Sequence, residues 1–293
     1  MHYGTTGLAR FNSKIGLWFH RICRWLFNTG FLKFNDKICS FYILHLPRRK
    51  DRKQKLSKHL SEIKLTNGNG TLNDHAIWWK GYDGVKKWSK KEHVGVYSFD
   101  LHWTVDPAPW FDLEPGALEV FKKKGQTIKC SNAESSIALG HIKMWKDFLK
   151  SDKECALFVE DDVKFSFRFE ERLNDILTKE LNKSEYDMLY LSTLPSEHGF
   201  TWDPHTKNTL RVFNGIWWMS GYILTKRGAQ KLIDNLPIVG PVDVWINHIF
   251  PQMNVFMSKE NLIVQADGGW SDNTYSFPEF WHDPTLGNSV ENK

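Results

Sequence analysis

The sequence lacks several features that would assign a protein to a class at sight. We find no transmembrane span, no internal repeat and no low-complexity block in its 293 residues. The net charge is only +5, from 39 basic and 34 acidic residues, and no nucleic-acid-binding motif is present. A charge this small does not indicate a nucleic-acid partner, so we expect none.

Cysteine is also scarce, and the four residues form neither a C-x-x-C pair nor a zinc-binding spacing. Two of them lie in apolar, strand-like runs. Buried, reduced thiols of this kind are typical of a cytosolic compartment, so we predict a cytoplasmic protein. The four residues are Cys23, Cys39, Cys130 and Cys155.

The composition that is present is that of a globular protein, with 41% hydrophobic and 25% charged residues. A chain of this length can bury the core of one large domain or of two small ones. Its fourteen tryptophans are an unusually large number. Because tryptophan is costly to bury unless its N–H finds a partner, and because its flat face suits sugar rings, two interpretations stay open. These are a carbohydrate partner and a tryptophan-rich core.

Residues 1–37 form a basic amphipathic segment. Apolar residues recur at helical spacing from Leu8 to Leu26, with most basic residues on the other side. The longest uncharged apolar run is too short for a signal peptide, and a bilayer-spanning helix would need about 20 apolar residues. Peripheral contact of residues 8–26 with anionic lipid fits this pattern, and so does packing of the same helix on the rest of the chain.

The most informative stretch begins at Cys155. An apolar run leads directly into three carboxylates, Glu160, Asp161 and Asp162, and apolar residues follow at once. The pattern predicts a buried strand that ends in an acidic turn at the rim of a sheet, where α/β proteins bind ligands. Adjacent carboxylates repel one another unless a cation or a ligand neutralises them, and Mg²⁺ and Mn²⁺ prefer carboxylate oxygens. The two interpretations are therefore a metal–diphosphate site and a plain acidic surface turn.

A second polar turn follows the first predicted strand, Ser40 to Leu46. Arg48, Arg49 and Arg52 occupy this turn and the start of the next helix. Guanidinium groups at the carboxyl end of a strand can bind diphosphate oxygens through paired hydrogen bonds. A solvated, basic helix start would have the same sequence pattern.

Strand-like and helix-like patterns alternate along the rest of the chain, which predicts an α/β layered domain. Ser131 and Glu134 have the spacing of a capping box, at the start of a helix whose apolar face also carries His141. A lone histidine on such a face is most often a satisfied core residue. Residues 98–116, rich in proline and aromatic residues, are predicted to form a long loop, either structural or a substrate lid. Further strands are predicted around Trp78–Trp79 and over Asp187–Leu191, Ile216–Leu224 and Leu262–Ala266.

Six blocks of sequence occur in a recognisable order. They are Tyr42-Ile43-Leu44-His45-Leu46-Pro47-Arg48-Arg49-Lys50-Asp51-Arg52, Asp83-Gly84, Ala133-Glu134-Ser135-Ser136-Ile137-Ala138-Leu139-Gly140-His141, Leu157-Phe158-Val159-Glu160-Asp161-Asp162-Val163, Tyr186-Asp187-Met188-Leu189-Tyr190-Leu191 and Gly221-Tyr222-Ile223-Leu224-Thr225-Lys226-Arg227-Gly228-Ala229. With these blocks the chain resembles glycosyltransferase family 25, the lipooligosaccharide and procollagen galactosyltransferase-like group. The likeness extends over residues 40–272, and the ordered set is more specific than any one block.

This resemblance implies a fold, a reaction and a cofactor. The expected fold is a single GT-A-like (Rossmann-related) α/β domain over residues 38–280, with a mixed central sheet flanked by helices, followed by a tail over residues 281–293. The expected donor is a UDP-sugar, most commonly UDP-galactose or UDP-glucose, used with Mn²⁺ (or Mg²⁺) at the acidic turn. Transfer in the family generally inverts the anomeric centre, and the acceptor would be a hydroxyl of a glycan, a lipid-linked molecule or a protein.

The resemblance also implies roles for the candidate residues. Glu160 and Asp162 would hold the metal, and Asp272 would complete its ligands. Asp243 would act as the general base that takes the proton of the acceptor hydroxyl, although it could equally cap the helix that follows it. The donor-binding residues would be Arg48, Arg49, Arg52, Asp83, Glu160, Asp161 and Gln265.

Departures from the family pattern leave the donor sugar open. His45 stands where the family usually has Asn, Gly140 replaces a Ser, and the usual Gly-Glu-x-Gly-Cys run reads differently over residues 133–137. The alternative function is a sugar-binding module on a transferase scaffold that has lost catalysis, and retention of the acidic turn argues against it. A metal-dependent phosphoesterase would need several separated His and Asp ligands, a pattern that we do not find.

Overall fold

The computed structural model describes most of the chain between residues 38 and 266. The predicted helix over residues 8–26, the predicted tail and Asp272 lie outside the described residues, so what was predicted for them stays a prediction. Among the helices of the described part, none is long and apolar enough to cross a membrane. The described ranges are 38–63, 70–84, 102–104, 127–129, 131–166, 168–181, 185–195 and 199–266.

A mixed sheet of eight strands forms the centre of the molecule, in the order β2-β1-β5-β12-β7-β13-β10-β9. Strands β2, β1 and β5 are parallel, β12 runs antiparallel between β5 and β7, and β13 is parallel to β7. The last two strands, β10 and β9, add an antiparallel edge. The strands are β1 (Ile38–His45), β2 (Ala76–Lys80), β5 (Cys155–Glu160), β7 (Met188–Tyr190), β9 (Thr201–Pro204), β10 (Thr209–Asn214), β12 (Gly221–Thr225) and β13 (Val255–Ser258).

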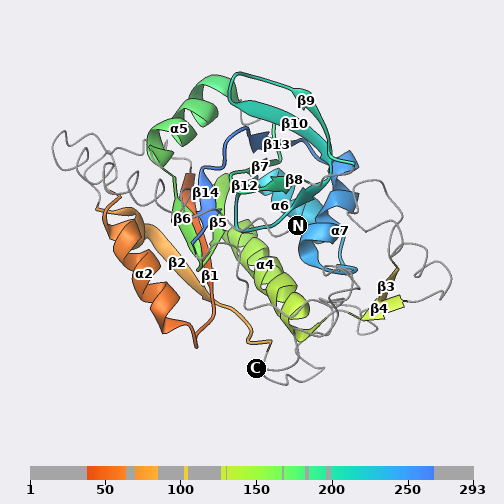
Figure 1. Cartoon of the computed structure of the whole chain (residues 1–293), viewed down its shortest axis with the longest axis horizontal. Coiled ribbons are helices and arrows are strands. Elements are labelled where there is room, and N and C mark those ends of the chain that lie inside the picture. Colours follow the sequence, from red (N-terminus) through yellow and green to blue (C-terminus); the bar gives the residue numbers. More distant parts are fainter. Residues whose placement is uncertain are drawn as a thin grey trace, which may run out of the picture.

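Helices cover both faces of this sheet (Figure 1). They are α2 (Lys50–Ser61), α4 (Asn132–Lys150), α5 (Phe169–Asp175), α6 (Lys226–Asp234) and α7 (Val242–Ile249). Because successive side chains of a strand point to opposite faces, Phe41 and Ile43 of β1 pack in the core layer of α2 and α5. Tyr42 and Leu44 pack in the layer of α4, α6 and α7. The predicted α/β fold, with a mixed central sheet flanked by helices, is confirmed.

Shorter elements connect these layers. The turn after β5 leads into β6, which pairs with β14 near the end of the described chain. The helix α5 continues in a π-helical turn, η3, and two 3₁₀ turns, η1 and η4, complete the connections. The bounds are β3 (His102–Thr104), β4 (Thr127–Lys129), β6 (Val163–Phe165), β8 (Leu194–Pro195), β11 (Ile216–Trp217), β14 (Ile263–Gln265), η1 (Leu72–His75), η3 (Ile176–Glu180) and η4 (Phe250–Gln252).

A row of aromatic side chains crosses four strands at one register level. Tyr42, Phe158, Tyr222 and Tyr190 are direct neighbours on β1, β5, β12 and β7. The rings of Tyr42 and Phe158 stack with their centroids 5.1 Å apart, and those of Phe158 and Tyr222 at 5.3 Å. Cross-strand aromatic pairs stabilise a sheet beyond the area that they bury. The row therefore holds the Tyr222 ring rigidly beneath α4.

Helix α4 begins with the predicted capping box. The Ser131 hydroxyl accepts a hydrogen bond from the Glu134 N–H at 3.1 Å, and the Glu134 carboxylate accepts one from the Ser131 N–H at 2.7 Å. Near the middle of the helix, Gly140 lies against β1, where a Cβ atom would come within 2.6 Å of Leu44 Cδ1. Glycine at this position lets α4 approach the sheet closely, and the next residue, His141, is fully buried.

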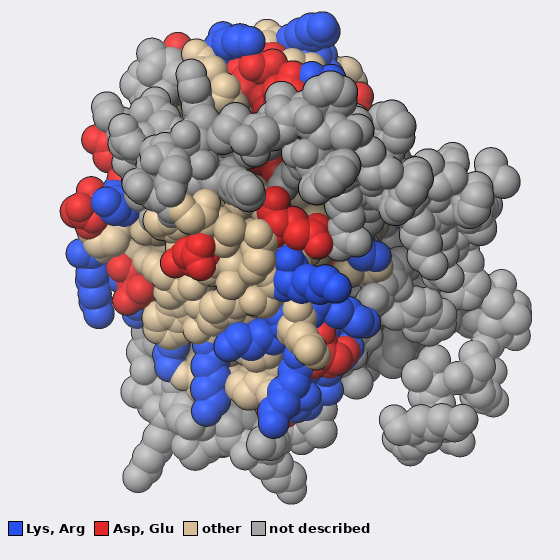
Figure 2. Space-filling model, turned by 90° about the vertical axis from the view of Figure 1, so that its left-hand side faces the viewer, with Lys and Arg blue, Asp and Glu red and all other residues tan. Residues whose placement is uncertain are grey.

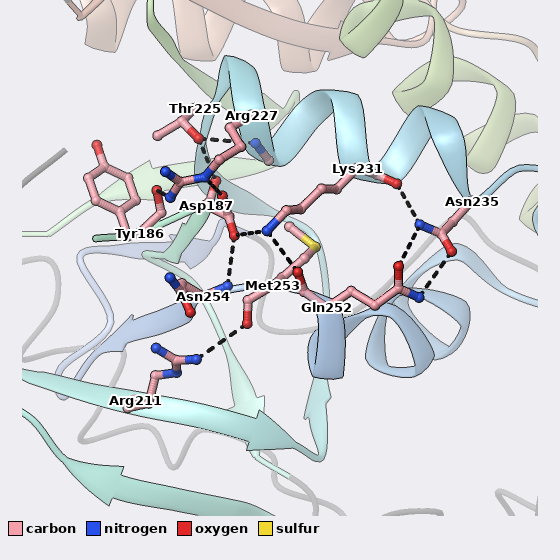
Figure 3. Close-up of polar contacts among 11 residues, drawn as sticks. Tyr186, Asp187, Arg211, Thr225, Arg227, Lys231, Asn235, Gln252, Met253 and Asn254 are labelled. Carbon is pink, nitrogen blue, oxygen red and sulfur yellow. Dashed lines mark hydrogen bonds and ion pairs between the residues drawn. The ribbon is translucent and has the colours of Figure 1, made fainter. Parts of the chain in front are cut away.

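At the amino end of β7, Asp187 is the centre of a polar network (Figure 3). Its carboxylate accepts hydrogen bonds from Arg227 Nε at 2.5 Å, from Lys231 Nζ at 2.8 Å and from the backbone N–H of Asn254 at 2.8 Å. Lys231 also donates to the Gln252 carbonyl at 2.8 Å. These contacts join α6 to the start of β7 and to the loop before β13.

The structure differs from the sequence prediction in three places. Residues 216–224, predicted as one strand broken by Gly221, form β11 and β12 in different sheets, and the break lies earlier, at Trp218, whose backbone is left-handed with φ of 73°. Residues 102–104, within the predicted loop, form β3 and pair with β4. The strands β9, β10 and β13 are absent from the sequence prediction.

Candidate active site

The carboxyl ends of β1 and β5 form one edge of the parallel part of the sheet. These strands are neighbours, with Leu44 beside Glu160. His45, at the end of β1, therefore lies next to the acidic turn that follows β5. In α/β sheets this edge is where ligands bind, so the two polar turns found in the sequence meet at the expected place.

Asp161 joins the two turns. One carboxylate oxygen, Oδ2, accepts hydrogen bonds from the backbone N–H of Leu46 at 2.9 Å and from His45 Nδ1 at 3.0 Å. The other oxygen lies 3.4 Å from Arg52 NH1. The side chain is only 5% exposed. Asp161 thus connects the acidic turn to the end of β1. His45, at the position where the family usually has Asn, is one of the two residues that make this connection.

Arg52 lies between two of the three acidic side chains. Its NH1 atom is 3.1 Å from Asp162 Oδ2, in addition to the contact with Asp161, and its side chain is 7% exposed. A buried guanidinium at this distance compensates part of the negative charge of the turn. Arg52 therefore contributes positive potential to the acidic turn from a buried position.

Arg48 and Arg49 are placed differently from Arg52. Arg48 Nε donates to the Asp83 carboxylate at 3.2 Å, and the Arg48 side chain is 38% exposed. The glycine after Asp83 packs against the first residues of α4, where a Cβ atom would clash with backbone. Arg49 forms paired hydrogen bonds with Asp51, of 3.0 and 2.9 Å, at the solvent-facing start of α2. Both arginines follow the end of β1, the strand that lies next to β5.

Glu160 and Asp162 carry more negative charge than their surroundings compensate. Burial, together with the charges of Asp161 and Asp243, raises the pKa of Glu160 to about 7, against the opposing effect of Arg52. Burial and the charge of Glu160 raise the pKa of Asp162 to about 7. The buried Oδ1 atom of Asp162 has no hydrogen-bond partner among the described residues. The protein therefore compensates the negative charge of Glu160 and Asp162 only in part.

Asp243 belongs to a later part of the chain, and the fold places it near this cluster. It lies in the first turn of α7, one residue after the helix begins, and its carboxylate accepts hydrogen bonds from the backbone N–H groups of Val244, at 3.1 Å, and Trp218. Burial raises its pKa, while these backbone bonds oppose the rise. The charge of Asp243 in turn raises the pKa of Glu160. The fold thus brings Asp243 within electrostatic reach of the acidic turn, and its bond to Val244 also stabilises the helix start.

The comparison with protein families gives one decisive result. A family model described as "Glycosyltransferase family 25 (LPS biosynthesis protein)" matches residues 38–246, which is more than half of the chain. The chain belongs to glycosyltransferase family 25. The matched range extends from β1 into α7 and contains every described candidate residue except Gln265.

Curated relatives lie in the same family at low identity. A glycosyltransferase 25 family member of Anopheles gambiae is 24% identical over 71% of this chain and 31% of its own length. Procollagen galactosyltransferase 1-B of Xenopus laevis is 22% identical over 70% of this chain and 30% of its own length. An inactive glycosyltransferase 25 family member 3 of Homo sapiens is 24% identical over 72% of this chain and 31% of its own length. The family 25 chain thus spans less than a third of the length of these relatives.

Gln265 reaches the same edge through β14. Its Nε2 atom donates to the Ser220 hydroxyl at 3.3 Å, and the Ser220 carbonyl accepts the backbone N–H of Glu160 at 3.2 Å. The next residue, Ala266, donates its N–H to the Asp162 carbonyl at 2.5 Å. The C-terminal strand of the described family 25 domain therefore closes on the acidic turn.

His141 is the residue of this site that the sequence analysis interpreted differently. We expected a satisfied core histidine. One ring nitrogen, Nδ1, is indeed hydrogen-bonded to the Tyr222 hydroxyl at 2.7 Å. The other, Nε2, faces the acidic turn at 3.9 Å from Glu160 Oε1. Its apolar helix face gave no signal of this second contact, which depends on how α4 packs on β5 and β12.

The acidic turn has a donor set that fits a divalent cation in part. The described residues contain no group of three or more His, Cys, Asp or Glu side chains arranged to hold a metal ion. Glu160 and Asp162 nevertheless provide hard oxygen ligands, and Asp162 Oδ1 is buried without a hydrogen-bond partner in the described structure. Such an oxygen is the atom that a cation would satisfy.

Proposed function

We propose that this family 25 protein is a metal-dependent hexosyltransferase that transfers galactose or glucose from a UDP-sugar to a hydroxyl group, with inversion. The acceptor would be a glycan, a lipid-linked molecule or a protein. The observation that carries the proposal is the juxtaposition of Asp243 with the under-compensated pair Glu160 and Asp162, at the ligand-binding edge of the sheet. The galactosyltransferase named among the relatives supports the choice of hexose.

Donor binding would use Arg48 and Arg49. A UDP-sugar brings a diphosphate with two negative charges, and the Arg48 guanidinium is half-exposed beside Asp83 at the entrance to the site. Arg49 can exchange its exposed partner, Asp51, for a phosphate oxygen at little cost. Asp161 and the buried Arg52 would act by holding the turn, and Gln265 by closing its rim.

Glu160 and Asp162 would hold Mn²⁺ or Mg²⁺, with Asp272 as the predicted third ligand. A bound cation would neutralise charge on the leaving diphosphate. The protein supplies two carboxylates, each with a pKa of about 7. A bound cation would lower both pKa values, because it stabilises the ionised form. Metal affinity should therefore rise with pH across the neutral range.

Asp243 would act as the general base. Inverting transfer requires that the acceptor hydroxyl lose its proton as its oxygen attacks the anomeric carbon. Burial raises the Asp243 pKa toward the working pH, which improves a carboxylate as a proton acceptor. The backbone N–H groups of Val244 and Trp218 fix the carboxylate in place, so that the proton is delivered to a defined oxygen.

The proposal also includes contact with a membrane. The predicted helix over residues 8–26 would bind anionic lipid, on a peripheral, cytoplasmic enzyme. The described surface adds positive charge, because Lys and Arg side chains gather on the face that carries α2 (Figure 2), where Lys50, Lys53, Lys55 and Lys58 are exposed. Sedimentation with anionic and neutral vesicles tests this directly; equal binding to both would contradict it.

The central experiment is a screen of UDP-sugars for turnover with Mn²⁺ and with EDTA. We expect cation-dependent release of UDP from one or two hexose donors, faster when acceptor glycans are added. The inactive human relative makes a non-catalytic, sugar-nucleotide-binding protein the second candidate. Tight binding of a UDP-sugar with no turnover, by the unsubstituted protein, would favour that second function.

A further inference from the structure

The two ring nitrogens of His141 have different surroundings. The side chain is fully buried between α4 and the sheet. Nδ1 lies 2.7 Å from the Tyr222 hydroxyl. Nε2 is buried and has no hydrogen-bond partner among the described residues, and Glu160 Oε1 is 3.9 Å away. A buried polar atom without a partner is rare and calls for an explanation.

Hydrogen-bond directions decide where the imidazole carries its proton. The Trp145 indole N–H can only donate, and it donates to the Tyr222 oxygen at 2.9 Å. The Tyr222 hydrogen then finds its acceptor in Nδ1 of His141, which leaves the imidazole proton on Nε2. In the opposite tautomer, the Tyr222 O–H would have no acceptor among the described residues, and the Nε2 lone pair would face a carboxylate. Only the Nε2–H tautomer gives a partner to the Trp145 N–H, the Tyr222 O–H and Nδ1 of His141, and it directs the remaining N–H toward the acidic turn.

The histidine is also neutral and rigidly held. Because Nδ1 accepts the Tyr222 hydrogen, the ring holds a single proton, on Nε2, and carries no charge. The Tyr222 ring is stacked on Phe158 with an interplanar angle of 13°, as part of the aromatic row. Trp145 is likewise fully buried. Nε2–H is therefore a fixed, uncharged donor that faces the acidic turn.

We propose that His141 is a positioning residue that orients the Glu160 carboxylate for cation binding, through the Nε2–H that Tyr222 and Trp145 hold in place. This role rests on the proposed function. The present separation of 3.9 Å exceeds a hydrogen bond of about 2.9 Å, so the proposal requires the partly exposed Glu160 side chain to turn toward Nε2 when the cation binds. An uncharged donor can orient a carboxylate without neutralising it, so that its full negative charge remains for the metal.

The first test is the tautomer, in the metal-free protein. Long-range ¹H–¹⁵N correlation spectra of the histidine rings distinguish the two neutral forms, and His141→Gln identifies the signal. We expect the Nε2–H form in the unsubstituted protein and a loss of that preference in Tyr222→Phe. A protonated Nδ1 or an imidazolium at neutral pH would overturn the proposal.

The second test compares two amides at the same position. The side-chain amide of Gln can place an N–H where Nε2 stands, whereas that of Asn reaches only the Nδ1 position. Relative to the unsubstituted protein, His141→Asn should weaken Mn²⁺ binding, titrated with UDP present, by about 10- to 100-fold, and His141→Gln by only about threefold. His248→Asn, at an exposed position of α7, is the matched control, and melting curves establish that all variants fold.

The outcomes separate this proposal from the proposed function. Equal Mn²⁺ binding by the Asn, Gln and unsubstituted proteins would show that His141 is a core residue only. Equal losses in both variants would show that packing, rather than a donor at the Nε2 position, is what the site needs. Failure of the unsubstituted protein to bind Mn²⁺ with UDP would overturn the proposed function together with this role.

Discussion

Carboxylates lie at both ends of β12, and their surroundings are opposite. At one end, the Thr225 N–H donates to the Asp187 carbonyl at 3.0 Å; at the other, the Ser220 carbonyl accepts the Glu160 N–H at 3.2 Å. Burial disfavours ionisation of Asp187, but hydrogen bonds from Lys231, Asn254 and Arg227 outweigh it and lower the pKa. The same burial raises the pKa of Glu160 to about 7, where Arg52 alone opposes it.

The difference separates a structural carboxylate from one that is prepared for a ligand. Asp187 receives donors from α6 and from the loop before β13, so its charge is satisfied by the fold itself (Figure 3). Among the described residues, Glu160, Asp162 and Asp243 share the site with one buried arginine, Arg52. Carboxylates whose mutual repulsion the protein compensates only in part are typical of functional sites, where a bound ligand supplies the missing compensation. Each prediction below changes one side of this comparison.

The largest effect is expected at Asp243. Asp243→Asn should lower kcat by a factor of about 10²–10⁴, because the amide cannot take the proton of the acceptor hydroxyl. UDP-sugar affinity and the melting temperature should change little. Steady-state kinetics and a binding titration measure these quantities, with Asp152→Asn, at a side chain that is 83% exposed, as the control. A kcat within a few-fold of the unsubstituted value would make Asp243 a structural residue of α7.

The next effect concerns the cation. Asp162→Asn should abolish Mn²⁺-dependent binding of the UDP-sugar, because it removes a charged ligand whose Oδ1 atom the described protein leaves without a hydrogen-bond partner. The melting temperature should stay the same or rise slightly, since one of the mutually repelling charges is gone. Calorimetric titration and a melting curve test both statements. Normal Mn²⁺-dependent turnover in this variant would contradict the assignment of Asp162 as a metal ligand.

Asp187→Asn should have the opposite profile. We expect a loss of unfolding free energy of about 2–4 kcal/mol, because the amide cannot accept all the hydrogen bonds of the carboxylate and leaves donors unpaired. The partial exposure of Arg227 and Lys231 limits the cost, since both can turn toward solvent. Denaturant unfolding measures it. The kcat of the folded fraction should be unchanged, and a marked fall in kcat would contradict the separation of the two ends.

The smallest effect is a pH dependence of the metal-free protein. Because the pKa of Glu160 and of Asp162 is raised to about 7, the folded protein binds more protons than the unfolded chain between their unfolded values and neutrality. Their contribution to stability is full below the unfolded pKa and is lost as the pH rises through the folded one. Asp187, whose pKa is lowered, contributes above its unfolded value and loses this contribution as the pH falls through the folded one.

In EDTA, the melting temperature should therefore fall by a few degrees as the pH rises from about 5.5 to 8. Asp162→Asn should flatten that decline, because one of the two titrating groups is removed. Added Mn²⁺ should reverse the decline most at the higher pH. A melting temperature that rises across this range would contradict the assignment of raised pKa values.

Much of the fold could be predicted because its elements have strong local signals. The apolar run from Cys155 forms β5 as expected, the Ser131 capping box starts α4, and the α/β alternation was sufficient for the class. The antiparallel strands were harder. β9 is exposed along its whole length and β13 is four residues long, so neither has a pattern that distinguishes it from a loop or a short helix. Their pairing depends on partners distant in the chain.

For the site, local sequence was sufficient to identify the available groups: the three carboxylates at the end of β5, the arginines after β1, and Asp243 at the start of α7. It determined them because residue type and strand ends are local properties. Which of these groups meet depends on strand register and helix packing, because these bring together residues such as Asp243 and Glu160 that are far apart in the chain. Packing also determines that Arg52 is buried while Arg48 is exposed, and that His141 directs one nitrogen to Tyr222 and the other to the acidic turn. Burial and partner geometry set the charge state of a side chain, and neither is written in its immediate sequence.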